Sequence, residues 1–182
     1  MLSTYILIFI ATAIPSLFSF QNKVSMALNI GDTPPDFSLP CATRDSIAPE
    51  NMKLSSLFGK SNIVLAFYPA DWSGGCTKEV CSFRDNFAAL SELGVEILGI
   101  SGDYVYSHRE WAKYHELPFK LLSDHDHAVA KTYNSYNEIS GMNKRTIYVI
   151  GKNGKIVYMD LLYSMRDADS FNKLKEALRK LK

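Results

Sequence analysis

Two cysteines lie close together in one segment, and the first of them lies where a protein makes a thiol reactive. Cys76 and Cys81 lie in the segment YPADWSGGCTKEVCSFRD, which follows an apolar run and leads into a stretch with helical spacing. The first turn of a helix presents unpaired backbone N–H groups and the positive end of the helix dipole. Both favour the thiolate, the nucleophilic form of cysteine. Position therefore makes Cys76 a candidate nucleophile, and Ser73 supplies a hydroxyl that can bond to its sulfur or to an incoming oxygen.

The spacing of the two cysteines restricts how they can react together. A helical offset of five residues corresponds to a rise of about 7.5 Å and a rotation of about 140° beyond one turn. A disulfide needs Cα atoms within about 6.8 Å and converging side chains. An intact helix therefore cannot hold a Cys76–Cys81 bond, and its first turns must unwind if the two react. The third cysteine, Cys41, follows Pro40 in a loop-like stretch with no partner suggested by spacing, and is interpreted as structural or incidental.

The elements that must position these residues alternate between strand and helix. Asn62–Tyr68 and Val95–Ser101 are apolar runs typical of buried strands, and the segment 76–93 between them has helical periodicity and ends at Gly94. The later segments predict a helix over 105–115, a strand over 119–122, a helix over 128–133, strands over 146–150 and 156–161 joined by an Asn153-Gly154 hairpin, and a helix over 167–181. This order predicts an α/β fold of thioredoxin-like type, with a mixed central sheet flanked by helices.

Composition excludes several classes of protein. The chain has 182 residues, 47% of them hydrophobic, and its 20 basic and 19 acidic residues leave a net charge of +1. This balance gives no basic footprint for nucleic acid. Three cysteines are too few for a disulfide scaffold. No repeat or linker follows residue 31, so residues 31–182 are predicted to form one domain.

Residues 1–30 differ from the rest and are predicted to be a targeting segment. Tyr5–Phe20 is almost wholly apolar, but it is short for a membrane span and is interrupted by Pro15. It fits the apolar core of a signal peptide, although no Lys or Arg precedes it. Gln21–Asn29 has no acidic residue and is weakly transit-like. Together they predict entry through the secretory route, with a plastid as one destination and no stable membrane span after processing. An uncleaved anchor helix remains the alternative.

The cysteine segment resembles that of the peroxiredoxins, the AhpC/TSA superfamily, and more narrowly their bacterioferritin-comigratory (BCP) or PrxQ-type branch. Pro69, Ser73 and Cys76 match the family motif Pro-x-x-x-Thr/Ser-x-x-Cys, and Cys81 matches the branch's resolving cysteine five residues on. The run GDTPPDFSL resembles the signature Gly-Asp-x-x-Pro-x-Phe-x-Leu, and Arg145 before TIYVI fits the place of a family arginine. The resemblance covers about residues 30–182.

The resemblance implies that the chain reduces hydrogen peroxide or organic hydroperoxides. Cys76 would attack a peroxide oxygen and become a sulfenic acid. Arg145 would stabilise the leaving oxygen and keep Cys76 ionised, Ser73 would orient the peroxide, and Pro69 would shield the sulfenic acid. Cys81 would then form an intramolecular disulfide, which a thioredoxin-like dithiol would reduce. No metal, haem or flavin is required, and a monomer or weak dimer is expected.

Two residues depart from the pattern of this branch. Ser73 stands where threonine is usual, which keeps the hydroxyl and loses a restraining methyl group. Gly74 stands where proline is usual, which makes the loop less rigid. Neither change removes a functional atom, so they affect the expected rate more than the reaction.

Other interpretations of the same residues remain open. Cys76 can be an inert core thiol, and Cys81 a packing residue with resolution by an external thiol. A protein disulfide oxidoreductase is a second function, although its usual Cys-x-x-Cys spacing is absent. A non-enzymatic redox sensor or holdase is a third. Trp72 either lines the entrance to the site or packs against its neighbours. Arg84 either supports the residues around Cys76 or is a surface charge.

The four histidines do not predict a metal site. They are His108, His115, His125 and His127, and none has the spacing of a metal-ligand motif. The run His125-Asp126-His127 is predicted to be a solvated loop.

Overall fold

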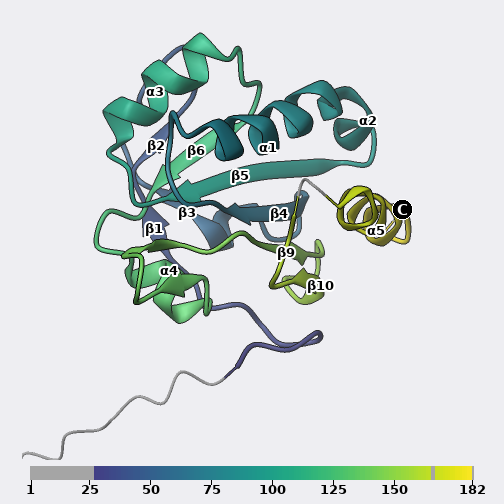
Figure 1. The fold of residues 1–182 in the computed structure, drawn as a ribbon. Coiled ribbons are helices and arrows are strands. Elements are labelled where there is room, and N and C mark those ends of the chain that lie inside the picture. The colour runs from purple at the N-terminus through teal and green to yellow at the C-terminus, as the bar shows by residue number, and fades with distance from the viewer. Residues whose placement is uncertain (1–26, 165–166, 182) are drawn as a thin grey trace, which may run out of the picture.

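A six-stranded mixed sheet forms the centre of the structure, a computed structural model that describes residues 27–164 and 167–181. The predicted targeting segment therefore lies almost wholly outside the described residues. The strand order is β10-β9-β4-β5-β6-β2 (Figure 1). These strands are β2 (Cys41–Ala42), β4 (Asn62–Phe67), β5 (Val95–Ser101), β6 (Lys120–Ser123), β9 (Thr146–Ile150) and β10 (Ile156–Asp160). The mixed sheet confirms the predicted thioredoxin-like class.

The other regular elements of the described residues are helices and short pairs of strands. The helices are α1 (Gly74–Asp85), α2 (Phe87–Ser91), α3 (Val105–Tyr114), α4 (Ala128–Thr132) and α5 (Ala168–Arg179), with a 3₁₀ turn, η1, at Leu54–Leu57. Two short antiparallel pairs join β1 (Ser38–Leu39) to β3 (Met52–Lys53) and β7 (Tyr136–Asn137) to β8 (Met142–Asn143). In the part of the chain that the structure describes, no helix is both long and apolar enough to cross a membrane.

Strand β4 lies between β5, to which it is parallel, and β9, to which it is antiparallel. All six of its residues are buried, as its apolar sequence predicts. Because successive side chains point to opposite faces, Val64 and Ala66 join one core cluster, whereas Ile63 and Leu65 join the other. Helices α1, α2, α3 and α5 contribute to the first cluster, and α4 and η1 to the second. Figure 1 shows α1, α2 and α3 on one side of the sheet and α4 on the other.

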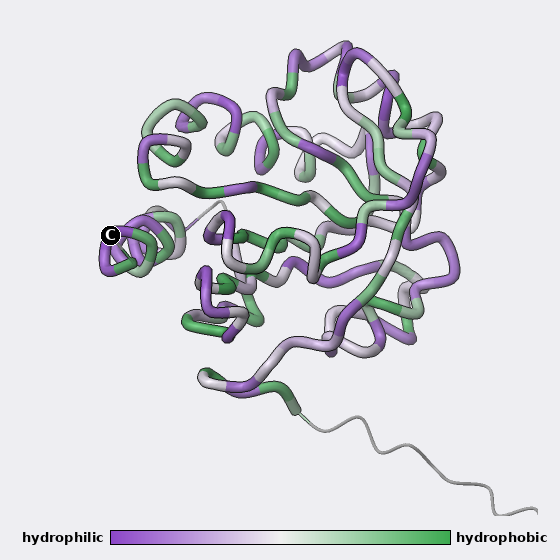
Figure 2. Tube along the Cα trace, turned by 180° about the vertical axis from the view of Figure 1, so that it is seen from behind, coloured by the Kyte–Doolittle hydropathy of each residue, from purple (hydrophilic) through white to green (hydrophobic). Residues whose placement is uncertain are grey.

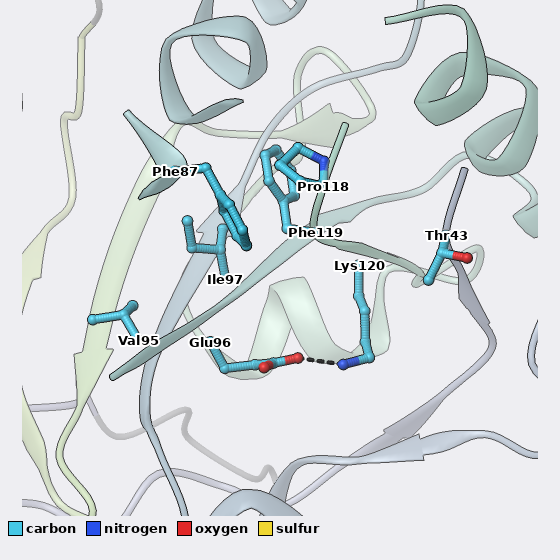
Figure 3. A pocket seen from close by; sticks show the side chains of 8 residues that line it. All are labelled: Thr43, Phe87, Val95, Glu96, Ile97, Pro118, Phe119 and Lys120. Atoms are coloured by element: carbon cyan, nitrogen blue, oxygen red, sulfur yellow. Dashed lines mark hydrogen bonds and ion pairs between the residues drawn. The ribbon is translucent and has the colours of Figure 1, made fainter. Parts of the chain in front are cut away.

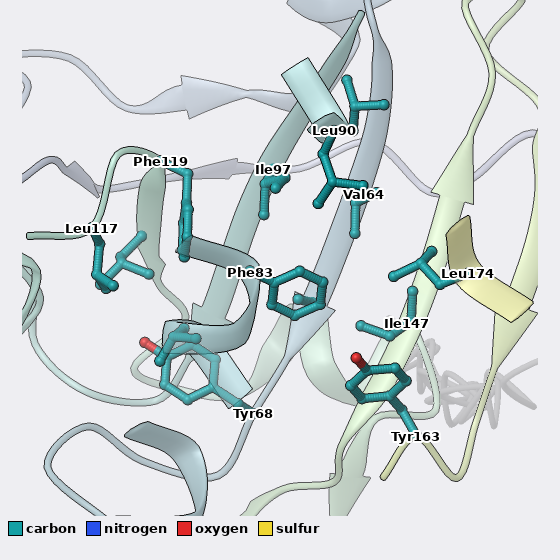
Figure 4. Packing of buried hydrophobic residues seen from close by; sticks show 14 of the residues in the cluster. Val64, Tyr68, Phe83, Leu90, Ile97, Leu117, Phe119, Ile147, Tyr163 and Leu174 are labelled. Atoms are coloured by element: carbon teal, nitrogen blue, oxygen red, sulfur yellow. The ribbon is translucent and has the colours of Figure 1, made fainter. Parts of the chain in front are cut away.

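The core on the first face fixes the helix that carries both cysteines. Val80 and Phe83 point from α1 into this cluster, where the ring of Phe83 stacks on Tyr163 at a centroid distance of 6.1 Å (Figure 4). Leu174 reaches the same cluster from α5, around which green and purple residues alternate in Figure 2. Burying each such side chain contributes about 1.5–3 kcal/mol. The C-terminal half of α1 is thus anchored, and Cys76 of its first turn also belongs to this cluster.

The prediction of one helix over 76–93 is wrong, because the chain forms two. Helix α1 ends at Asp85, and Asn86 leaves the helical region with φ −103° and ψ 6°. The side-chain amide of Asn86 donates to the Ser82 carbonyl at 2.9 Å, which satisfies an acceptor at the helix end. The second helix stops before Gly94, whose φ of +69° suits glycine, as predicted.

The other predicted elements are confirmed, with ends that agree to within two residues. Gly154 adopts φ +71° in the turn between β9 and β10, so the predicted hairpin is present. The prediction that Cys41 lies in a loop is wrong. It lies in β2, is 3% exposed and pairs with Leu122 of β6 at the sheet edge. Burial raises the pKa of its thiol, which fits a structural residue.

Candidate active site

The loop after β4 delivers Cys76 to the first turn of α1. Ser73 is the N-cap residue, and its Oγ accepts a hydrogen bond from the Cys76 backbone N–H at 3.3 Å. The Ser73 hydroxyl also lies within donating distance, 3.3 Å, of the Ala70 carbonyl. Cys76 was expected to open the helix, but Gly74 does, so Cys76 is its third residue. Pro69 lies, half-buried, at the start of this loop.

Arg145 contacts the sulfur of Cys76. Its Nη2 donates to Cys76 Sγ at 3.2 Å, and Cys76 is fully buried. Strand pairing brings Arg145 close to Cys76 although the two are far apart in the sequence, because Thr146 of β9 pairs with Phe67, the last residue of β4. Arg145 therefore lies where the cysteine loop begins. A Cβ at Gly75 would lie 3.0 Å from Arg145 Nη2, so the absence of a side chain there leaves room for the guanidinium.

Glu79 is a member of this cluster that the sequence analysis missed. It follows Cys76 by three residues, so both side chains lie on one face of α1. Its Oε2 accepts from Arg145 Nη1, and its side chain is only 2% exposed. Burial raises the pKa of the Glu79 carboxyl to about 7, and Arg145 opposes this rise. Burial disfavours the charge of Arg145, but Glu79 and Cys76 outweigh it and raise the pKa of the guanidinium.

Cys81 lies one and a half turns further along α1 and is partly exposed. Its Sγ is 3.9 Å from Nδ1 of His115, the residue that caps the C-terminal end of α3. Arg84 Nη1 donates to the His115 carbonyl at 2.9 Å. All three cysteines are free thiols. Both Cys76 and Cys81 lie within one continuous helix, the arrangement that was predicted to prevent a bond between them without unwinding.

A buried polar network that the sequence analysis also missed holds the cysteine loop against α3. The Asp71 carboxylate accepts from the Tyr68 hydroxyl at 2.8 Å and from the Ser107 hydroxyl at 2.8 Å. It also lies 2.9 Å from Nδ1 of the fully buried His108. Burial and the charge of Asp71 raise the pKa of Tyr68 well above its usual value. Trp72 is 53% exposed, adopts φ +58° and lies 3.3 Å from Ser107 Oγ through its indole nitrogen.

The histidines and the pocket away from Cys76 add nothing to this cluster in the part of the chain that the structure describes. Among residues 27–164 and 167–181, no group of three or more His, Cys, Asp or Glu side chains is placed to hold a metal ion. His125 and Asp126 are exposed and His127 is partly buried, in the predicted loop. A pocket of about 160 Å³ lies at the opposite end of β5, where the Glu96–Lys120 ion pair spans its floor (Figure 3). None of the candidate site residues lines it.

Comparison with known proteins identifies the family of this chain. The AhpC/TSA family matches residues 30–159. The chain is 36% identical over 169 residues to chloroplastic peroxiredoxin Q of Populus jackii, which covers 91% of this chain and 76% of that protein. It is 36% identical over 137 residues to the putative peroxiredoxin bcp of Coxiella burnetii, covering 72% of this chain and 87% of the other.

A solved structure supports the same conclusion. The crystal structure of peroxidoxin BcpB from Mycobacterium tuberculosis is 31% identical and superposes with a TM-score of 0.72. The match covers 85% of this chain and 99% of the solved one. The chain therefore belongs to the AhpC/TSA family and is a peroxiredoxin, a thiol-dependent peroxidase.

Proposed function

We propose that Cys76 is the peroxidatic cysteine of this peroxidase, acting on hydrogen peroxide or an organic hydroperoxide. The observation that carries the proposal is the 3.2 Å contact between Arg145 Nη2 and Cys76 Sγ in the first turn of α1. A guanidinium and a helix N-terminus both stabilise negative charge on the sulfur. They also remain in place to stabilise the oxygen that leaves.

The first step forms an S–O bond and breaks the O–O bond. The Cys76 thiolate attacks one peroxide oxygen and becomes a sulfenic acid, and the other oxygen leaves as water or an alcohol after taking a proton. Arg145 has several N–H donors in a fixed fork, so it can contact both the sulfur and the developing oxyanion. Ser73 is the residue proposed to orient the peroxide, and Pro69 the one that shields the sulfenic acid.

The second step joins Cys76 to Cys81 with loss of water. Because both sulfurs belong to α1, its first turns must unwind for this disulfide to form. A thioredoxin-like dithiol then reduces the disulfide and restores both thiols. Every redox change of the protein itself occurs at sulfur, while the peroxide oxygens are reduced, so the cycle requires no metal, haem or flavin.

A Cys81→Ser chain is expected to complete one turnover and then recycle poorly. The measurement is peroxide consumption coupled to thioredoxin, its reductase and NADPH, with one-equivalent peroxide pulses in parallel. Wild-type protein should turn over repeatedly, whereas steady-state turnover of the variant falls by about tenfold or more because the sulfenic acid has no internal partner.

The same assay separates the competing functions. A redox sensor or holdase would consume only stoichiometric peroxide, and a protein disulfide oxidoreductase would reduce insulin disulfides without consuming peroxide. Full multiple turnover of Cys81→Ser would contradict the proposed resolving role.

Replacing Glu79 by glutamine is expected to make the first step slower and to change its pH dependence. Above about pH 7 the Glu79 carboxylate is charged and holds Arg145 Nη1, whereas below that pH it becomes neutral like the glutamine. The rate constant for the reaction with peroxide should therefore be about tenfold lower than that of the wild type near pH 8. This factor corresponds to the free energy of about one charge-assisted hydrogen bond. The difference should shrink below about pH 6 as wild-type Glu79 takes up a proton. Stopped-flow fluorescence across this range measures it, and a ratio that does not vary with pH would contradict the argument.

We further propose that residues 1–30 are a targeting segment, that residues 31–182 form one domain, and that the protein works in a plastid as a monomer or weak dimer. The support for location is that several curated relatives carry the description chloroplastic. Imaging a tagged full-length chain tests the location, and a purely cytosolic signal would contradict it.

A further inference from the structure

The thiol of Cys81 faces a histidine ring across the interface between α1 and α3. His115 Nδ1 lies 3.9 Å from Cys81 Sγ, within hydrogen-bonding reach for sulfur. The backbone of His115 is tied to α1, because its carbonyl accepts from Arg84 Nη1 at 2.9 Å. The imidazole also packs against Trp111, Tyr114 and Trp72, with ring centroids 5.8, 4.9 and 6.3 Å away. The ring is thus held in one position beside the sulfur.

The resolving step needs what this contact can supply. The attacking group in disulfide formation is a thiolate. A cysteine without assistance is only a few per cent ionised near pH 7. The helix N-terminus and Arg145 act on Cys76, whereas Cys81 lies further along α1 and Arg84 is the nearby cation. A base is therefore useful at Cys81 in a way that it is not at Cys76.

The charges around His115 favour a neutral ring that can accept a proton. Burial and the positive charge of Arg84 lower the pKa of His115 from its usual value of 6.5. On α1, Arg84 is itself paired with Asp85. On its own segment His115 lies between the exposed Tyr114 and the exposed Glu116. Because His115 is partly exposed, the proton that it accepts can pass on to water.

We propose that His115 is the general base of the resolving step and takes the proton from Cys81. This inference rests on the proposed function, in which Cys81 attacks the Cys76 sulfenic acid. The S–S bond forms as the S–O bond of Cys76 breaks. The hydroxide that leaves gains a proton, and the proton taken up by His115 is returned to solvent, so the net change is loss of one water. Oxidation has already occurred in the peroxide step, so no further oxidant is required.

The fold sets when this proton moves. The first turns of α1, which hold Cys76, must unwind for the disulfide to form, whereas Val80 and Phe83 anchor the part of the helix that holds Cys81. Cys81 therefore stays beside His115 as Cys76 approaches, and the proton passes to His115 as the S–S bond forms. His115 touches a reacting sulfur, which makes its role catalytic and distinct from that of Arg84, which positions the His115 backbone.

The test is stopped-flow tryptophan fluorescence after mixing reduced full-length chain with peroxide. It resolves sulfenic acid formation from disulfide formation, and trapping plus mass spectrometry identifies the Cys76–Cys81 bond. For His115→Gln we expect an unchanged first phase and a second phase slower by up to about 30-fold near pH 7, the inverse of the few per cent of thiolate present without a base. The second-phase rate of the variant should rise about tenfold per pH unit and meet the wild-type rate near pH 9.5, where a thiol ionises unaided. The wild-type rate should be nearly flat above about pH 6.5 and fall in more acidic solution as His115 is protonated.

Two further variants separate catalysis from packing. In His115→Ala, added imidazole should restore the second phase, which a packing role would not allow. His125→Ala removes an exposed histidine that stacks on Tyr104 and should leave both phases unchanged. A disulfide that forms at the wild-type rate in His115→Gln would overturn the base and leave the proposed function standing. A chain that consumes peroxide but never forms the Cys76–Cys81 disulfide would overturn both the base and the resolving role.

Discussion

Replacement of Cys76 by serine is expected to abolish peroxide reduction. The rate constant should fall by on the order of 10⁴-fold or more, because a serine hydroxyl is not ionised near neutral pH and oxygen cannot carry the sulfenic acid state. The guanidinium of Arg145 would remain in place without a nucleophile to activate. Consumption of hydrogen peroxide and of an organic hydroperoxide, both coupled to a thioredoxin system, measures the loss.

Cys41→Ser is the matched control for this variant. Cys41 is as inaccessible as Cys76, but it lies in β2 at the far edge of the sheet, where it pairs with β6. Its replacement should leave the rate constant unchanged and lower the free energy of unfolding by about 1 kcal/mol, since a hydroxyl is buried in place of a thiol. Peroxide turnover that survives in Cys76→Ser and disappears in Cys41→Ser would show that the nucleophile has been assigned to the wrong cysteine.

The sequence predicts the architecture well where the pattern is long. The apolar runs of β4 and β5 and the amphipathic helix α5 extend over enough residues for periodicity to identify them. By contrast β2, β7 and β8 have two residues each, which is too few to show a period in hydrophobicity. The break at Asn86 is a change in the backbone angles of one residue, so the helical spacing of apolar residues continues straight through it.

The candidate site could be predicted only in part, for a similar reason. Cys76 and Ser73 are neighbours in the chain, and the start of a helix is readable from sequence. Glu79 shares a helix face with Cys76, and that spacing was a usable signal, but its burial against Arg145 depends on the pairing of β9 with β4. The contact between Asp71 and His108 joins residues 37 positions apart through a polar network that hydrophobic patterning does not register.

The two cysteines experience different surroundings although they belong to one helix. Cys76 is fully buried and faces a guanidinium, whereas Cys81 is partly exposed and faces an imidazole. A permanent cation suits a nucleophile that must be ionised before substrate arrives. A neutral base suits a thiol that attacks only after Cys76 has been oxidised, because the base can take the proton during that attack.

The second large effect is expected on replacing Arg145 by glutamine. The variant keeps a hydrogen-bond donor near Cys76 but loses the charge that faces both the sulfur and Glu79. Removing a donor to a developing oxyanion costs about 10²–10³ in rate, and we expect a fall of that size in the rate constant for sulfenic acid formation. The second, disulfide-forming phase should change far less, because Cys76 moves away from Arg145 when the first turns of α1 unwind. Stopped-flow fluorescence measures the two phases separately.

Loss of the guanidinium also leaves Glu79 buried without its ion-pair partner, which gives the prediction a stability signature. The pKa of Glu79, already about 7, should rise further, because the attraction of Arg145 no longer opposes burial. A carboxyl whose pKa is raised by folding contributes stability below its unfolded value of about 4.5 and loses it as pH rises through the folded value. Arg145→Gln should therefore be less stable than wild type near pH 8 and recover in acid.

The double variant Arg145→Gln, Glu79→Gln removes the buried acid and should recover stability near pH 8 without recovering activity. If the double variant recovers the peroxide rate as well, the slow step in Arg145→Gln comes from the unpaired carboxyl and not from the missing cation.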